Sequence, residues 1–290
     1  MSSLGDNPHA GRQGANGSAD PPCEGPIIAL DRVFFSSKDR KGKTIGILQD
    51  FSLRVAPGEF VAVVGPSGCG KSTALNFMAG LVKGHQSGTV RVRGVDVSGI
   101  AQGIGYMFQT HGLFPWRNII DNVCLSLEVQ GAPLEQRRSK ASGLLAELGL
   151  AGFENHYPAE ISGGMRQRVS LARTLATDPA ILLMDEPFGA LDAQTKLLVQ
   201  DGFVAYWEKN QKTVVFVTHD LSEAIFLADR VVVMSARPGR VKAEYTVPFP
   251  RPRNLAEIRV SAEYGELWER IWLDLKDEAR HSMQGGLHDQ

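Results

Sequence analysis

The residues best suited to chemistry form a glycine-rich segment, GPSGCGKST, at Gly65 to Thr73. It matches the phosphate-loop pattern, in which glycines let backbone N–H groups turn toward an anion. A helix that begins near Lys71 adds a partial positive charge of about half a unit at its N-terminus. We expect Lys71 to reach the β- and γ-phosphates of a nucleotide and Ser72 to bind magnesium. The predicted phosphate-binding residues are Gly65, Pro66, Ser67, Gly68, Cys69, Gly70, Lys71, Ser72 and Thr73.

Two adjacent carboxylates, Asp185 and Glu186, follow an apolar run at 181–184. A buried strand that ends in this way delivers charge to the carboxyl edge of an α/β sheet, where ligands bind. Asp185 suits magnesium coordination, and Glu186 suits taking a proton from an attacking water or orienting it. Alone, such a pair is more often a loop start or a helix cap. The phosphate loop in the same chain favours the chemical role.

A second candidate anion site lies at the start of a helix predicted at 164–176. Ser162, Gly163 and Gly164 stand at this start. Ser162 is a favourable N-cap residue, and that explains it without any ligand. Paired glycines at a helix start also let backbone N–H groups approach a phosphate. The residues alone leave both interpretations open.

The elements that must position these motifs follow from apolar and β-branched runs, several of them apolar on both faces. Such runs suit a central sheet covered by helices, which is an α/β layout. The predicted strands are 27–33, 51–55, 60–64, 89–92, 104–108, 181–184, 213–218 and 230–234. The predicted helices are 71–79, 164–176, 196–209 and 221–228.

The outer parts of the chain differ from this core. Residues 1–26 hold no apolar run, so we predict a disordered tail and no secretion signal. At about 110–162 the strand signals fade, and Leu134, Ala141, Leu144, Leu145 and Leu148 fall on one helical face, which predicts an inserted helical subdomain. Residues 248–290 begin with PFPRPR and continue with an amphipathic pattern, which predicts a short terminal helix that docks on the body.

Composition limits the partners. The 290 residues are 43% hydrophobic and 22% charged, as in a globular protein. The net charge of -1 gives no basic excess, so we expect no nucleic-acid partner. Cys23, Cys69 and Cys124 lack metal-ligand spacing, which favours free thiols in a reducing compartment. The apolar runs are strand-sized, so any membrane role requires another chain.

Taken together, residues 27–247 resemble the nucleotide-binding subunit of an ATP-binding cassette (ABC) transporter. The resemblance rests on six ordered motifs: the phosphate loop, Gln109 after a strand, the signature ISGGM, the pair Asp185 and Glu186, the turn Ala190-Leu191-Asp192, and His219 after TVVFVT. It implies the α/β fold of a P-loop NTPase core of the ABC ATPase type. This fold has an antiparallel β subdomain and an inserted α-helical subdomain.

The resemblance also implies an activity and a set of roles. ATP and Mg²⁺ are the expected cofactors, and ATP with water gives ADP and phosphate. The expected catalytic residues are Glu186, His219, which contacts the γ-phosphate, and Gln109, which senses magnesium or water. The expected magnesium residues are Ser72, Gln109 and Asp185.

A head-to-tail dimer of two copies of the chain is a further implication. Each ATP would lie between the phosphate loop of one copy and Ser162, Gly163 and Gly164 of the other. Asp192 would lie at the dimer seam. The signature departs from the family pattern at Ile161 and at Met165, but its Ser-Gly-Gly unit is intact.

The aromatic residue that stacks on adenine in this family has no clear counterpart here. Its expected place falls near Ser37, whereas Phe34 and Phe35 lie just before it and the polar segment SSKDRKGKT follows. We predict Phe35 as the stacking residue. The alternative is that both phenylalanines pack the strand.

Further segments indicate what the ATPase drives. LFPWRNIIDNV, MDEPFGALDA and SARPGRV are most similar to importers of nitrate, sulfonates, taurine or bicarbonate. This implies integral membrane permease subunits, a solute-binding protein as an indirect partner, and a peripheral location at the cytoplasmic face of the inner membrane. Phe114 and Trp116 would then form a groove for a permease helix, or else they pack the core.

Two alternatives belong to other classes. A soluble cassette ATPase of translation would need a second phosphate loop, and one of DNA repair a long coiled-coil insertion; the sequence has neither. A nucleotide-binding module without turnover would be expected to lack Glu186 or His219, and both are present.

Overall fold

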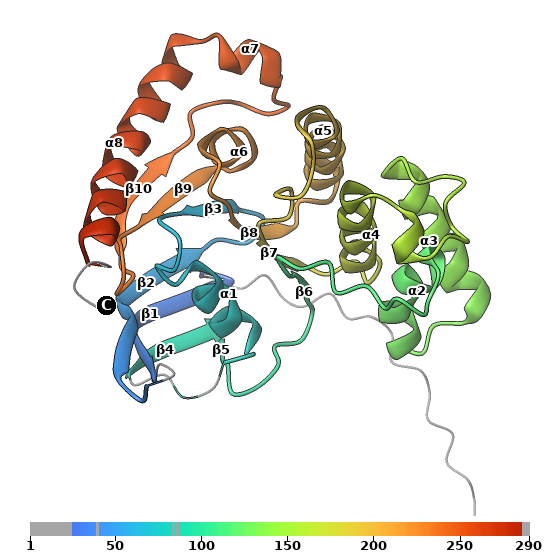
Figure 1. Cartoon of the computed structure of the whole chain (residues 1–290), viewed down its shortest axis with the longest axis horizontal. Coiled ribbons are helices and arrows are strands. Elements are labelled where there is room, and N and C mark those ends of the chain that lie inside the picture. Colours follow the sequence, from blue (N-terminus) through green and yellow to red (C-terminus); the bar gives the residue numbers. More distant parts are fainter. Residues whose placement is uncertain (1–24, 39–40, 83, 85–86, 286–290) are drawn as a thin grey trace, which may run out of the picture.

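The computed structural model describes residues 25–38, 41–82, 84 and 87–285. All but the last two residues of the tail predicted at 1–26 lie outside these ranges, as does Cys23. The described chain forms two sheets, a group of helices on one side, and a long C-terminal helix (Figure 1).

The larger sheet carries the predicted motifs. Its order is β10-β9-β3-β8-β7-β6, and all neighbouring pairs are parallel except β9 with β10. The strands are β3 (Phe60–Val64), β6 (Ile104–Met107), β7 (Ile181–Asp185), β8 (Thr213–Val217), β9 (Arg230–Met234) and β10 (Val241–Thr246). The first five correspond to predicted strands, whereas β10 was not predicted.

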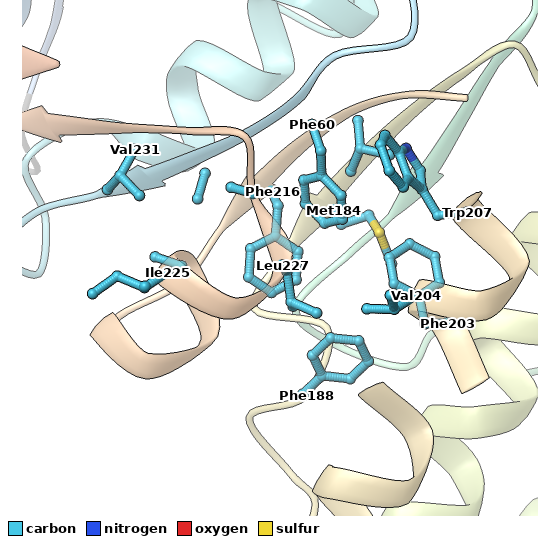
Figure 2. Packing of buried hydrophobic residues seen from close by; sticks show 14 of the residues in the cluster. Phe60, Met184, Phe188, Phe203, Val204, Trp207, Phe216, Ile225, Leu227 and Val231 are labelled. Atoms are coloured by element: carbon cyan, nitrogen blue, oxygen red, sulfur yellow. The ribbon is translucent and has the colours of Figure 1, made fainter. Parts of the chain in front are cut away.

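Both faces of this sheet are buried, as the apolar runs predicted. In β3, Phe60, Ala62 and Val64 belong to one hydrophobic cluster, and Val61 and Val63 belong to another on the opposite face. The helices α5 (Ala193–Asn210) and α6 (Leu221–Leu227) cover the first face, where aromatic side chains from strands and helices pack together (Figure 2). The helix α1 (Lys71–Ala79) covers the second face.

The smaller sheet is antiparallel, which confirms the predicted β subdomain. Its order is β2-β1-β4-β5, with β1 (Ile28–Lys38), β2 (Thr44–Val55), β4 (Ser87–Val92) and β5 (Val95–Asp96). The predictions ended the first strand at 33 and began the second at 51, and both limits were wrong. The polar segment instead extends both strands, because cross-strand pairs such as Phe35 with Leu48 and Lys38 with Thr44 hold it in register.

The helical unit contains α2 (Ile119–Val129), α3 (Leu134–Glu147) and the 3₁₀ turn η1 (Pro158–Glu160). It also uses one face of α4 (Gly163–Leu175), so its core extends beyond the predicted limit at 162. Ala141 and Leu145 are buried in this core as predicted. Leu134 is 57% exposed, so its predicted place in the apolar face was wrong; it is the first residue of α3.

The C-terminal region docks on the body, as predicted. After α7 (Leu255–Arg259), α8 (Ala262–Gly285) lies along the molecule beside β10 (Figure 1). Leu267 and Ile271 are buried in the cluster that covers the large sheet. At 24 residues α8 is longer than the short helix expected. None of the helices in the described ranges has both the length and the apolar character needed to cross a bilayer.

Candidate functional site

The phosphate loop connects β3 to α1 and is closely held on several sides. Gly68 and Gly70 have φ values of 75° and 109°, which favour glycine. A Cβ atom at Gly70 would lie 2.8 Å from the Leu48 side chain and 3.1 Å from the Ile47 carbonyl oxygen, so a larger residue here would require its neighbours to shift. The Lys71 ammonium donates hydrogen bonds to the carbonyl oxygens of Gly65 and Pro66, at 2.8 and 3.0 Å. The Lys71 side chain therefore binds the backbone at the start of the loop.

The two strand-end carboxylates lie in different surroundings. Asp185 is the last residue of β7 and is 6% exposed. Burial raises the pKa of its carboxyl above the ordinary value, although a hydrogen bond with Ser72 and the charge of Lys71 oppose the rise. Asp185 thus contacts the phosphate-loop helix directly, as its predicted role requires.

Glu186 follows with a φ of 49°, which is unusual for a residue with a side chain. Its N–H donates to the carbonyl oxygen of Val217 at the end of β8, at 2.9 Å. This backbone turn separates the Glu186 side chain from that of Asp185. The two adjacent carboxylates therefore have different partners: Ser72 lies beside Asp185, and Gln109 and His219 lie beside Glu186.

Sheet order explains how the three predicted catalytic residues come together. Gln109, Glu186 and His219 follow β6, β7 and β8, which are neighbours in the large sheet. The Gln109 amide donates to Glu186 Oε2 at 3.0 Å, and His219 Nδ1 lies 3.3 Å from Glu186 Oε1. Carboxyl ends of parallel strands share one edge, where α/β proteins bind their ligands. The structure thus places all three groups beside the phosphate loop's sheet edge.

A charged network behind His219 was missed by the sequence analysis. The Lys196 ammonium on α5 lies 2.5 Å from Glu223 Oε1 and 2.9 Å from Asp220 Oδ2, and Glu223 also accepts a short hydrogen bond from the Thr218 hydroxyl. Burial disfavours the charge of Lys196, but its hydrogen bonds with Glu223 and Asp220 keep the pKa of this amine above its ordinary value. The network connects the helix after Asp192 to the residues on either side of His219. No sequence spacing joins positions 196 and 223.

The signature segment begins α4. Ser162 is its N-cap and accepts a hydrogen bond from the Met165 N–H at 3.2 Å. Ser162 is exposed, and in Figure 1 β6 and β7 lie between α4 and α1. The buried Gln167 side chain donates to the Pro187 carbonyl oxygen at 2.5 Å, which ties α4 to the segment after Glu186. Gln167 was not among the residues predicted from the sequence.

Asp192, Phe35 and Ser37 are the remaining positions considered in the sequence. Asp192 caps α5, and the Thr195 N–H, at 3.0 Å from its carboxylate, lowers the pKa of that group. Phe35 is half-buried, with its ring 5.1 Å from that of Phe77 in an edge-to-face contact. Ser37, the place where the family pattern expects the stacking residue, is exposed. Phe35 as the adenine-stacking residue stays a prediction.

The donor set near the phosphate loop fits magnesium rather than a metal held by protein alone. No group of three or more His, Cys, Asp or Glu side chains suited to a metal occurs in the described ranges. The Ser72 hydroxyl and the Asp185 carboxylate meet at the loop, and both offer oxygen. Mg²⁺ is usually bound by one or two such groups together with phosphate oxygens and water.

Comparisons with known proteins agree with this geometry. A family model described as "ABC transporter" matches residues 48–189. An uncharacterized ABC transporter ATP-binding protein of Methanocaldococcus jannaschii is 45% identical over 243 residues, 84% of this chain and 89% of that protein. The chain therefore belongs to the ABC transporter ATP-binding proteins, and it is an ATPase.

Named relatives and a solved structure add detail. Taurine import ATP-binding proteins TauB of Yersinia pestis and Rhizobium johnstonii are 46% and 43% identical, covering 70% and 82% of this chain and 79% and 92% of theirs. The dimeric post-hydrolysis structure of the cassette MJ0796, bound to ADP and Pi, matches with a TM-score of 0.70 and 32% identity. That match covers 77% of this chain and all of the other.

Proposed function

We propose that this chain is the ATP-hydrolysing subunit of an ABC importer that drives uptake of a small anion of the nitrate, sulfonate, taurine or bicarbonate class. The observation that carries the importer assignment is the 46% and 43% identity to two taurine import ATP-binding proteins. The alternative is an ABC ATPase that works without a membrane partner.

The proposed reaction uses the cluster at the sheet edge. ATP phosphates bind the N–H groups and the lysine of the phosphate loop. Ser72 and Asp185 would hold Mg²⁺, with Gln109 beside them, and the ion would neutralise charge on the phosphates. Glu186 orients the attacking water or takes its proton, and His219 contacts the γ-phosphate. Water adds to the γ-phosphorus as the bond to ADP breaks.

The dimer is the second part of the proposal. Ser162, Gly163 and Gly164 would bind the γ-phosphate held by the phosphate loop of a second copy, and Asp192 would lie at the seam. The dimeric structure of a cassette bound to ADP and Pi supports this arrangement. The exposure of Ser162 also supports it, because Ser162 caps α4 and β6 and β7 lie between α4 and α1 in Figure 1.

The permease contact forms the third part. Trp116 is 71% exposed and its ring lies 5.2 Å from that of half-buried Phe114. An exposed tryptophan favours the groove interpretation over core packing at this position. We place the chain at the cytoplasmic face of the membrane, attached to permease subunits, with a solute-binding protein on the other side.

Reconstitution tests the proposal. The chain is combined in liposomes with its neighbouring permease and solute-binding subunits, and uptake of labelled taurine, nitrate, an alkylsulfonate and bicarbonate is measured with internal ATP. We expect ATP-dependent uptake of one of them and none with Glu186→Gln. Trp116→Ala should reduce uptake while the isolated chain still hydrolyses ATP. Hydrolysis that is indifferent to permease subunits, with no uptake of any solute, would favour the alternative.

A further inference from the structure

The turn between β9 and β10, residues 235–240, lies directly against the phosphate loop. A Cβ atom at Gly239 would lie 2.1 Å from the Cys69 carbonyl oxygen, so the two backbones are in close contact. Gly239 also donates to Ile47 O at 2.8 Å and accepts from the Gln49 N–H at 3.0 Å. The turn is thus held between the phosphate loop and β2. This is the SARPGRV segment of the sequence, which the proposed function does not use.

Arg237 extends the same contact along the loop. Its guanidinium lies 3.7 Å from the position of a Cβ atom at Gly68, whose φ is 75°. The turn is closed internally, because the Ser235 N–H donates to the Arg240 carbonyl oxygen at 2.9 Å and the Arg240 N–H donates to the Ser235 hydroxyl at 3.0 Å. It therefore acts as one small rigid unit. Moving this unit would move the backbone of Gly68 and Cys69.

A carboxylate of the C-terminal helix α8 contacts this turn. Glu278 Oε2 accepts a hydrogen bond from the Ala236 N–H at 2.8 Å, and Oε1 lies 3.1 Å from the Lys242 ammonium. The Glu278 side chain is only 14% exposed. Burial raises the pKa of the Cys69 thiol, Lys71 opposes this, and the charge of Glu278 adds to the rise. The electrostatic field of Glu278 therefore extends to the phosphate loop.

Other contacts fix α8 without involving the turn. Leu267 and Ile271 are buried in the core, and Asp274 accepts a hydrogen bond from the Tyr245 hydroxyl at 2.5 Å. Lys242 also donates to the carbonyl oxygen of Asp274 at 3.0 Å. The helix is therefore a fixed support on β10, and Glu278 is the point where it contacts the turn.

We infer that Glu278 is a positioning residue for the phosphate loop, and that the C-terminal helix is thereby a working part of the ATP site. Backbone N–H groups bind phosphate well only when they are already in place. Glu278 fixes the turn, the turn supports Cys69 and Gly68, and the loop keeps its N–H groups in the binding geometry. This inference rests on the proposal that the phosphate loop is the ATP site.

The expected effect is on nucleotide affinity rather than on the chemical step, because Glu278 is connected to the loop and not to Glu186. In the full-length protein, Glu278→Ala should raise the Kd for MgATP roughly three- to tenfold, the scale of the net contribution of one ordinary hydrogen bond. The kcat at saturating ATP should stay within about twofold, since uniform binding alone is lost. Glu278→Gln keeps an acceptor for the Ala236 N–H and should lie between Glu278→Ala and the unaltered chain.

Asp274→Ala is the matched control, because Asp274 lies one turn earlier on α8 and contacts β10 but not the turn. We expect it to bind MgATP as the unaltered chain does. Equal Kd values for Glu278→Ala and Asp274→Ala, with both proteins folded by circular dichroism, would overturn the inference. If Glu278→Ala does not fold, the same comparison is made between Glu278→Gln and Asp274→Asn. An unaltered chain that fails to bind MgATP would instead contradict the proposed site itself.

Discussion

Two helix starts in this molecule carry glycines, and their surroundings differ. The phosphate loop before α1 contains the buried Cys69 and Lys71 and is supported by β2 and by the turn at 235–240. At the start of α4, Ser162 is exposed, and its hydroxyl accepts a hydrogen bond from the Met165 N–H of the same helix. Among the described residues, a Cβ atom added at Gly163 would meet only the Arg166 guanidinium, at 3.7 Å. The phosphate loop is thus supported on several sides by its own chain, whereas the signature is exposed.

This difference is consistent with the different tasks that we propose for the two sites. A site fixed by tertiary contacts on several sides can bind phosphate with little rearrangement. A helix start that faces outward needs a partner to enclose its ligand. The groups proposed to break the bond, Glu186, Gln109 and His219, all lie with the phosphate-loop side. The signature would contribute only when another copy arrives.

The largest predicted effect tests whether the chemistry belongs to the phosphate-loop side. Glu186→Gln should lower turnover about 10²- to 10⁴-fold, because the neutral amide cannot take a proton from water. Binding of MgATP should persist, since Glu186 is not part of the loop. Steady-state phosphate release and equilibrium binding of ATP measure the two quantities. Unchanged hydrolysis would remove Glu186 from its proposed role.

A second prediction probes the outward-facing site. Gly163→Asp should lower turnover roughly tenfold or more, because a negative charge would face the γ-phosphate. The fold should tolerate it, since the nearest atom to a Cβ there is 3.7 Å away and acidic residues are favourable in the first turn of a helix. Gly163→Ala, which adds volume without charge, is the control and should keep most of the activity. Similar losses in both variants would indicate a steric effect instead.

The smallest predicted effect separates the two interpretations of Ser162. Ser162→Ala should cost about 1 kcal/mol of unfolding free energy, the usual value of an N-cap. Ser162→Asp should restore that stability, because aspartate also caps helices. The variant protein should still hydrolyse ATP slowly, because the added carboxylate would lie beside a phosphate and repel it. Thermal or denaturant unfolding and ATPase assays report the two effects. Full activity in Ser162→Asp would leave Ser162 as a cap alone.

The sequence predicted the parts of this site that are local. The phosphate loop, the strand-end carboxylates and the helix cap at Ser162 each depend on a few consecutive residues. The roles of Gln109 and His219 came only with the resemblance to a family, and the sheet order that brings both residues to Glu186 was not predicted. The contacts of Lys196 with Glu223 and of Ala236 with Glu278 join residues 27 and 42 positions apart, so no periodicity predicts them. The polar hairpin between β1 and β2 was missed because its strands are stabilised by pairing rather than by apolar alternation.

Mixing two inactive variants tests the central claim, that one ATP site needs two copies of the chain. Lys71→Ala disables the phosphate loop and Gly163→Asp disables the signature, so each homodimer has no intact site. In a mixed dimer, one site joins an intact phosphate loop to an intact signature. We expect ATPase activity to return on mixing and to rise with the fraction of mixed dimers. Activity that stays at the level of the separate variants, with mixed dimers shown to form, would contradict it.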